Sequence, residues 1–169
     1  MNLETRLEQA LEVDLALSER QVWRHYGLNL EQCEQAGLSI TRALIAPTVK
    51  MRHPREVAFV SLEPQTRVGF ELRHLAGIAE MRQSLHVQPE DWQVIEHAAS
   101  ISPDAIWQRN LETWAVEFDS GSYSLRTILE KQQHFRAAFD GQVWGVASEA
   151  RGAKLYSVLK ARLLVLCPF

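Results

Sequence analysis

The segment 113–119 constrains the fold most, because bulky and polar side chains alternate along it. It reads TWAVEFD, with Trp, Val and Phe at every second position and with Glu117 and Asp119 between them. Successive side chains of an extended strand point to opposite faces. The segment therefore predicts a strand with one apolar face, with Glu117 and Asp119 side by side on the other.

Helical and strand-like patterns alternate around this segment. An amphipathic pattern precedes it, and turn signals such as Asp140-Gly141 separate the patterns that follow. The prediction is a mixed α+β (α/β) arrangement in which helices flank a sheet. The predicted helices are 66–86, 124–139 and 148–160, and the other predicted strands are 92–96, 102–107, 142–147 and 163–166.

The N-terminal region has a different pattern. Helices are predicted over 3–15, 21–26 and 29–36, a further helical turn over 39–44, and then two extended runs within 46–60. Short helices followed by a hairpin are the outline of a winged helix, which places a helix in the major groove of DNA and a wing on its backbone. The alternative is a helical cap whose charges only solvate a loop.

Basic residues are concentrated at the predicted tip of this hairpin. The net charge of the chain is −3, so its surface is not basic throughout, but a local basic patch is enough to contact phosphates. The predicted DNA-binding residues are Lys50, Arg52, His53 and Arg55.

The composition of the chain and its cysteine spacing limit the cellular location that we expect. Hydrophobic residues make up 46% of the 169 residues, as in globular domains, and no apolar stretch reaches the length of a membrane span. Cys33 and Cys167 lie far apart, without metal-binding spacing, and the N-terminus lacks the pattern of a signal peptide. We therefore expect a cytoplasmic location and no membrane partner.

The predicted chemistry depends on three carboxylates. Asp104 begins the strand before 113–119, and an antiparallel hairpin would fold it back toward Glu117 and Asp119. Carboxylates that converge repel one another unless a proton or a cation neutralises them, and such oxygen ligands suit Mg²⁺ or Mn²⁺. A metal held there can polarise a phosphodiester for hydrolysis. The alternative is that Glu117 and Asp119 are exposed polar positions of a half-solvated strand.

A wider set of motifs resembles a known family. The set consists of His74 in a helix, Pro103-Asp104-Ala105, Glu117-Phe118-Asp119-Ser120-Gly121, and then Lys131 and Phe135. It is similar to the replication-relaxation proteins of bacterial mobile elements, and the resemblance covers residues 18 to 160. It implies a winged-helix-like region over 1–62 and a restriction-endonuclease-like domain of the PD-(D/E)xK type over 63–169.

The chain departs from the active members of that superfamily. Asp119 stands where they carry a lysine, and Lys131 is the residue that could replace it in stabilising charge. The resemblance also implies an acidic ligand from the first helix of the domain, for which Glu80 is the first candidate and Glu71 the second. The predicted catalytic set is Asp104, Glu117, Asp119 and Lys131, and the predicted metal ligands are Asp104, Glu117 and Glu80.

Three functions stay open at this point. The first is a DNA-binding accessory of replication, transposition or transcription with a degenerate nuclease site. The second is a metal-dependent DNA endonuclease, and the third is a protein-interaction module without nucleic-acid contact. DNA is the expected partner for the first two, and a homodimer or a larger nucleoprotein complex fits a protein of this kind.

Overall fold

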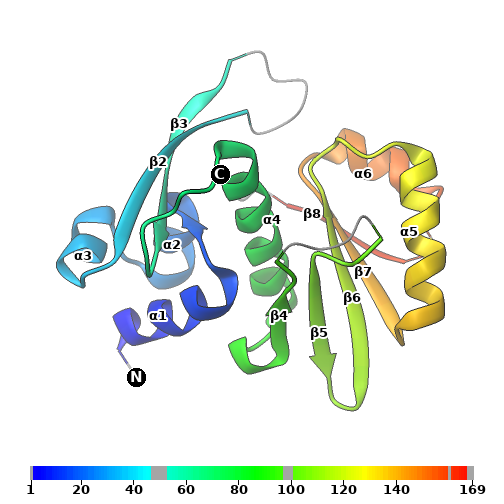
Figure 1. Ribbon diagram of the computed structural model, residues 1–169, viewed down its shortest axis with the longest axis horizontal. Helices are drawn as coiled ribbons and strands as arrows, with labels where there is room; N and C mark the ends of the chain where they lie inside the picture. The colour runs from blue at the N-terminus through cyan, green and yellow to red at the C-terminus, as the bar shows by residue number, and fades with distance from the viewer. Residues whose placement is uncertain (1, 47–52, 97–100, 160, 167–169) are drawn as a thin grey trace.

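The computed structural model describes residues 2–46, 53–96, 101–159 and 161–166. It confirms the mixed α+β class, with a three-stranded antiparallel sheet and a five-stranded mixed sheet among the described residues (Figure 1). The helices are α1 (Leu3–Asp14), α2 (Glu19–Tyr26), α3 (Leu30–Gln35), α4 (Gly69–Leu85), α5 (Leu125–Ala138) and α6 (Glu149–Tyr156). The strands are β1 (Leu17–Ser18), β2 (Ser39–Ile45), β3 (Arg55–Ser61), β4 (Trp92–Val94), β5 (Ala105–Arg109), β6 (Glu112–Asp119), β7 (Gly141–Val146) and β8 (Arg162–Val165).

The N-terminal helices begin where the sequence predicts. Ser18 caps α2 and Asn29 caps α3, and in both cases the glutamine three residues later completes a capping box. Gly27 ends α2 in the left-handed conformation, with φ +67°. After α3 the chain enters the small sheet, whose strand order is β1-β3-β2.

One predicted element is wrong. The segment 39–44, predicted as a helical turn, belongs to β2, which pairs with β3 from Ser39 opposite Ser61 to Ile45 opposite Arg55. Ile40 and Thr41 are β-branched and favour a strand once a partner strand is available. The first arm of the hairpin therefore lies before residue 46, not within 46–60.

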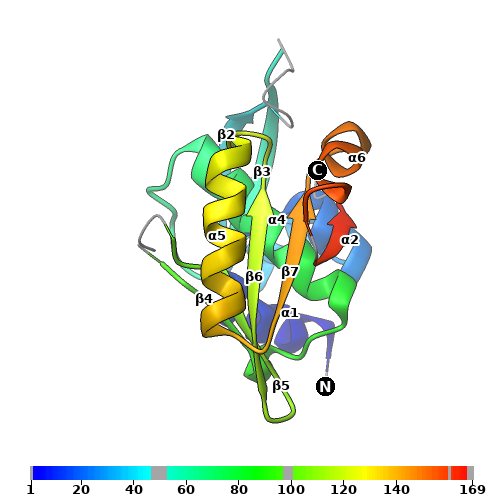
Figure 2. The same cartoon turned by 90° about the vertical axis from the view of Figure 1, so that its right-hand side faces the viewer.

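The second sheet has the order β4-β5-β6-β7-β8. Its first three strands are antiparallel neighbours, whereas β7 and β8 run parallel to β6 and are reached through α5 and α6. Figure 2 shows β6 and β7 side by side with α5 alongside them. Parallel strands share their direction, so the carboxyl ends of β6, β7 and β8 lie at one edge of the sheet and their amino ends at the other.

Helix α4 lies between the two sheets (Figure 1). Leu72 packs with the small-sheet residue Phe59, whereas Ile78 packs with Phe118 of the large sheet. The approach to β6 is close, since a Cβ at Gly77 would lie 2.1 Å from the Phe118 ring. The sequence predicted one apolar side, but α4 is buried on several sides because it fills the space between two sheets.

The division at residues 62 and 63 into two domains stays a prediction. Within the described ranges, no helix is both long and apolar enough to cross a membrane.

Candidate functional site

Asp104 lies immediately before β5 and is 8% exposed. One oxygen, Oδ2, accepts the backbone N–H of Phe118 at 2.7 Å, and the other, Oδ1, lies 3.0 Å from Nε2 of His74 on α4. Burial lowers the pKa of His74, but the hydrogen bond and the charge of Asp104 outweigh it and raise this pKa above its usual value. The negative charge of Asp104 therefore makes His74 bind a proton more readily than an isolated histidine does.

Glu117 lies within β6 and is fully buried. Its Oε1 lies 2.6 Å from Nζ of Lys131 on α5, and that ammonium also donates to the carbonyl oxygen of Ser102 at 2.8 Å. Burial and the neighbouring charge of Asp104 raise the pKa of Glu117 to about 8, whereas Lys131 acts in the opposite direction. The other oxygen, Oε2, is buried and has no hydrogen-bond partner among the described residues.

Asp119 ends β6 and is also fully buried. Its Oδ2 accepts from Nε of Arg151 on α6 at 2.7 Å, and its Oδ1 accepts from the backbone N–H of Gly121 at 2.7 Å. Arg151 donates as well to the carbonyl oxygen of Tyr123, at 2.7 Å. Through these hydrogen bonds, the end of β6 contacts both α6 and the loop that follows the strand.

Together these residues form what we call the carboxyl-end centre. It consists of three acid–base pairs, and each joins an acidic side chain in or next to the large sheet to a basic side chain from a different helix. The alternative that Glu117 and Asp119 are exposed strand positions is wrong, because both are fully buried. The pairs are Asp104 with His74, Glu117 with Lys131, and Asp119 with Arg151.

Glu80, the predicted third metal ligand, lies elsewhere. Its side chain accepts from Nε2 of Gln21 at 3.0 Å and is paired with Arg24 of α2 at 2.5 Å. Six residues separate it from His74 on α4, which amounts to about 9 Å along a helix. Glu71, the second candidate, is exposed and accepts the backbone N–H of Val68 at the start of α4. The structure therefore places Glu80 away from the carboxyl-end centre, whereas Glu71 lines the same cavity as His74 and Asp104.

The donors fit a divalent metal poorly. Among the described residues, no group of three or more His, Cys, Asp and Glu side chains is arranged to hold a metal ion. Both oxygens of Asp104 already have partners, and of the two Glu117 oxygens only Oε2 has none. Of the oxygens of Asp104 and Glu117, Oε2 of Glu117 is therefore the one that a cation could bind without displacing a described partner.

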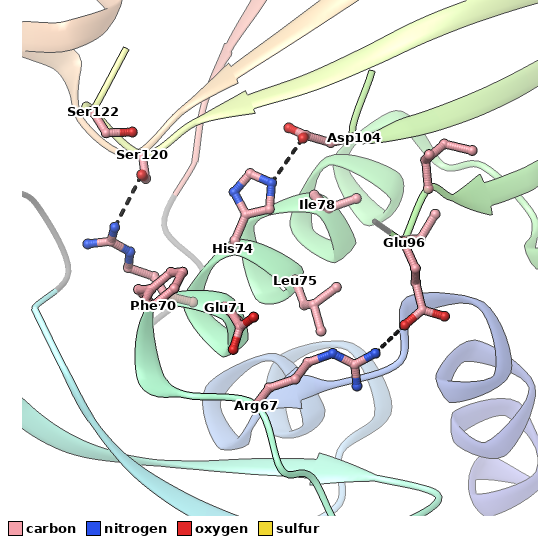
Figure 3. A pocket seen from close by; sticks show the side chains of 13 residues that line it. Arg67, Phe70, Glu71, His74, Leu75, Ile78, Glu96, Asp104, Ser120 and Ser122 are labelled. Carbon is pink, nitrogen blue, oxygen red and sulfur yellow. Dashed lines mark hydrogen bonds and ion pairs between the residues drawn. The ribbon is translucent and has the colours of Figure 1, made fainter. Parts of the chain in front are cut away.

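A cavity of about 500 Å³ opens beside the centre, and Figure 3 shows its lining. His74 and Asp104 lie at one side of it, and Arg67 is joined to Glu96 at another. Arg73 also lines the cavity and donates to Ser120 Oγ at 3.2 Å, while its Nε is buried without a partner. The cavity therefore gives solvent access to the His74–Asp104 pair.

Two of the four predicted DNA-binding residues are described, and they lie just before β3 and at its first position. His53 and Arg55 are exposed, and Arg55 begins β3. Lys50 and Arg52 lie outside the described residues. The structure thus places the two described members of the set at the same end of the hairpin.

The sequence patterns predicted no role for Arg151 or Tyr123. The pairing of Arg151 with Asp119 depends on how α6 packs against β6. Tyr123 follows Asp119 by four residues, and Nζ of Lys131 lies 5.3 Å from its ring centroid. A glycine turn after Asp119 was the available signal that the chain could fold back over the carboxylates.

The fold and the centre define a mixed α+β protein with buried carboxylates at the carboxyl end of its central strand. A model of the replication-relaxation family matches residues 35–149, well over half of the 169 residues. The chain therefore belongs to the replication-relaxation family, which confirms the resemblance found in its motifs and indicates a role in the replication or relaxation of mobile elements. No curated protein and no solved structure matches it.

Proposed function

We propose that this protein is a DNA-binding accessory of replication whose nuclease-like domain has lost catalysis. The observation that carries the proposal is the pairing in the carboxyl-end centre. Asp104, Glu117 and Asp119 each contact a basic side chain of the same chain. Acidic side chains that are paired in this way contribute to the fold, and few of their oxygen lone pairs are left to bind a catalytic metal.

The N-terminal region supports the DNA-binding part of the proposal. Its elements follow the order α1, β1, α2, α3, β2, β3, with the sheet order β1-β3-β2, which suits a winged helix. Glu31 and Glu34 are exposed on α3, so this helix would be repelled by phosphates. We therefore assign the DNA contact to the basic end of the β2–β3 hairpin, which acts as the wing.

Fluorescence anisotropy with a labelled DNA duplex over a series of salt concentrations tests the DNA-binding part. The Arg55→Ala variant should bind more weakly on every sequence, and its slope of log K against log salt should be shallower by about 1. Arg42→Ala is the matched control, because Arg42 lies on β2 and faces Glu56 at 3.7 Å. Absence of salt-dependent binding would overturn this part and favour a protein-interaction module.

A Mg²⁺- or Mn²⁺-dependent endonuclease is the second candidate. One observation favours it: within the described part of the chain, Glu117 Oε2 is buried without a hydrogen-bond partner, and the pKa of this carboxyl group is raised by burial and by Asp104. A group in this state is typical of sites that accept a proton or a cation.

Supercoiled plasmid distinguishes the two candidates. It would be incubated with the protein in Mg²⁺, Mn²⁺ or EDTA, beside the Asp104→Asn and Glu117→Gln variants. Our proposal predicts unchanged plasmid in every lane. Metal-dependent nicking that disappears in both variants would establish the endonuclease instead.

A further inference from the structure

A groove lies at the amino ends of β6, β7 and β8, the opposite edge of the large sheet from the carboxyl-end centre. It has a volume of about 490 Å³ and is bounded by the β5–β6 hairpin, the last turn of α5 and the start of β7. We call it the amino-end groove. The residues that matter in its lining are Arg109, Trp114, Arg136, Phe139, Asp140 and Arg162.

Positive charge exceeds negative charge in the lining of this groove. Arg109, Arg136 and Arg162 are all exposed, and none of them has an ion-pair partner among the described residues. Asp140 is the acidic residue of the lining, and its Oδ2 already accepts the backbone N–H of Thr113 at 2.8 Å. Three unpaired guanidinium groups around one cavity favour an anionic ligand with several charges.

Aromatic rings lie among these charges. The Arg109 guanidinium carbon is 5.2 Å from the centre of the Trp114 ring and 5.4 Å from that of Trp107. The Trp114 ring lies directly over Gly141, where a Cβ would come within 2.5 Å of it. Phe139 adds a second, partly exposed ring to the lining. Glu112 accepts from Nε1 of Trp114 at 2.9 Å, which holds the indole in place.

We propose that the amino-end groove binds single-stranded DNA. Arginines contact the phosphates of a single strand, and aromatic rings stack on its unpaired bases, which are inaccessible inside a duplex. The combination of three arginines that have no ion-pair partner among the described residues with the partly exposed ring of Phe139 fits this ligand better than an acidic peptide, which has no bases to stack. The proposal goes beyond the duplex contact assigned to the wing and involves a different part of the chain.

The test uses fluorescence anisotropy with a labelled oligo(dT) of about 12 nucleotides, a length in the range that one such site covers. The Arg136→Gln/Arg162→Gln variant should bind about tenfold more weakly at low salt, with a salt slope shallower by about 1.4. Arg126→Gln is the matched control, because Arg126 lies on the same helix and is paired with Glu130. Its affinity should equal that of the unmodified protein.

Two further measurements separate this site from the wing. The double variant should keep its affinity for duplex, and an abasic oligonucleotide should bind the unmodified protein more weakly than oligo(dT) does. The proposal would be overturned by absence of binding to oligo(dT), by equal affinity of the double variant, or by equal affinity of the abasic strand. Because the single variants and Phe139→Ala can be measured in the same way, poor folding of one variant leaves the test intact.

Discussion

The two edges of the large sheet hold their charges in opposite ways. At the carboxyl ends of the parallel strands, Asp119 is fully buried and is paired with Arg151. At the amino ends, Arg136 and Arg162 are exposed and have no acidic partner among the described residues. Charges paired inside the protein stabilise its fold, whereas unpaired charges at the surface are available to a ligand.

This comparison assigns different roles to the same residue type. An arginine that neutralises a buried carboxylate cannot be removed without leaving a buried charge, which is costly. An exposed arginine neutralises no buried charge, so its removal should change ligand binding and not the free energy of unfolding. The predictions below test that contrast.

The largest effect is expected at Arg151. Replacement by Met leaves the Asp119 carboxylate buried without its cation, so the free energy of unfolding should fall by about 3 kcal/mol. Urea denaturation followed by circular dichroism measures it. Arg126→Met serves as the control, because the Arg126–Glu130 pair is exposed, and it should leave the unfolding midpoint unchanged. An Arg151→Met variant with an unchanged free energy of unfolding would mean that the arginines at the two edges of the sheet do not differ in their contribution to stability.

Stability should also depend on pH through the carboxyl-end centre. The pKa of Glu117 is raised to about 8 and that of His74 is raised as well, so the folded state binds these protons more tightly than the unfolded state. For each of these two groups, the free energy of unfolding should therefore fall by about 1.4 kcal/mol per pH unit between the pKa of the unfolded state and that of the folded state, which for Glu117 is the range from about pH 4.5 to about pH 8.

The Glu117→Gln variant sharpens the pH prediction. Its amide does not titrate, so the part of the pH dependence that comes from Glu117 should disappear from its denaturation curves. A variant with the full dependence of the unmodified protein would show that Glu117 is not responsible.

The smallest effect is expected at the amino-end groove. Arg136→Gln and Arg162→Gln should each change the free energy of unfolding by less than about 0.5 kcal/mol, because both side chains are exposed and unpaired. Thermal unfolding of the two variants beside Arg151→Met gives the comparison in one experiment. A large loss of stability in either variant would indicate that the replaced arginine forms a stabilising ion pair in the folded protein.

Much of the large sheet could be predicted from local patterns. The alternation along 113–119 correctly placed Glu117 and Asp119 on the face opposite Phe118, since Lys131 of α5 contacts Glu117 and α4 contacts Phe118. The capping boxes at the starts of α2 and α3 also depend on residues only three positions apart. Such features depend on residues a few positions apart, and a single sequence contains them.

The partners of the carboxylates could not be predicted in the same way. Asp119 and Arg151 are 32 positions apart, and their contact depends on the packing of α6 against β6. Glu80 was expected near Asp104, but α4 contacts elements on several sides, so its acidic residues face different neighbours. The amino-end groove likewise combines residues from three distant segments.

The central claim is that the acidic side chains at the carboxyl ends are paired with basic side chains of the same chain and do not bind a metal. A double-mutant cycle on Glu117 and Lys131, measured by urea denaturation at about pH 9 with and without Mg²⁺, tests it most directly, because Glu117 is then ionised. We predict that Lys131→Met loses about 3 kcal/mol, that the double variant with Glu117→Gln regains part of it, and that Mg²⁺ has no effect. An additive cycle, together with stabilisation by Mg²⁺ that Glu117→Gln abolishes, would contradict the claim and assign the centre to metal binding.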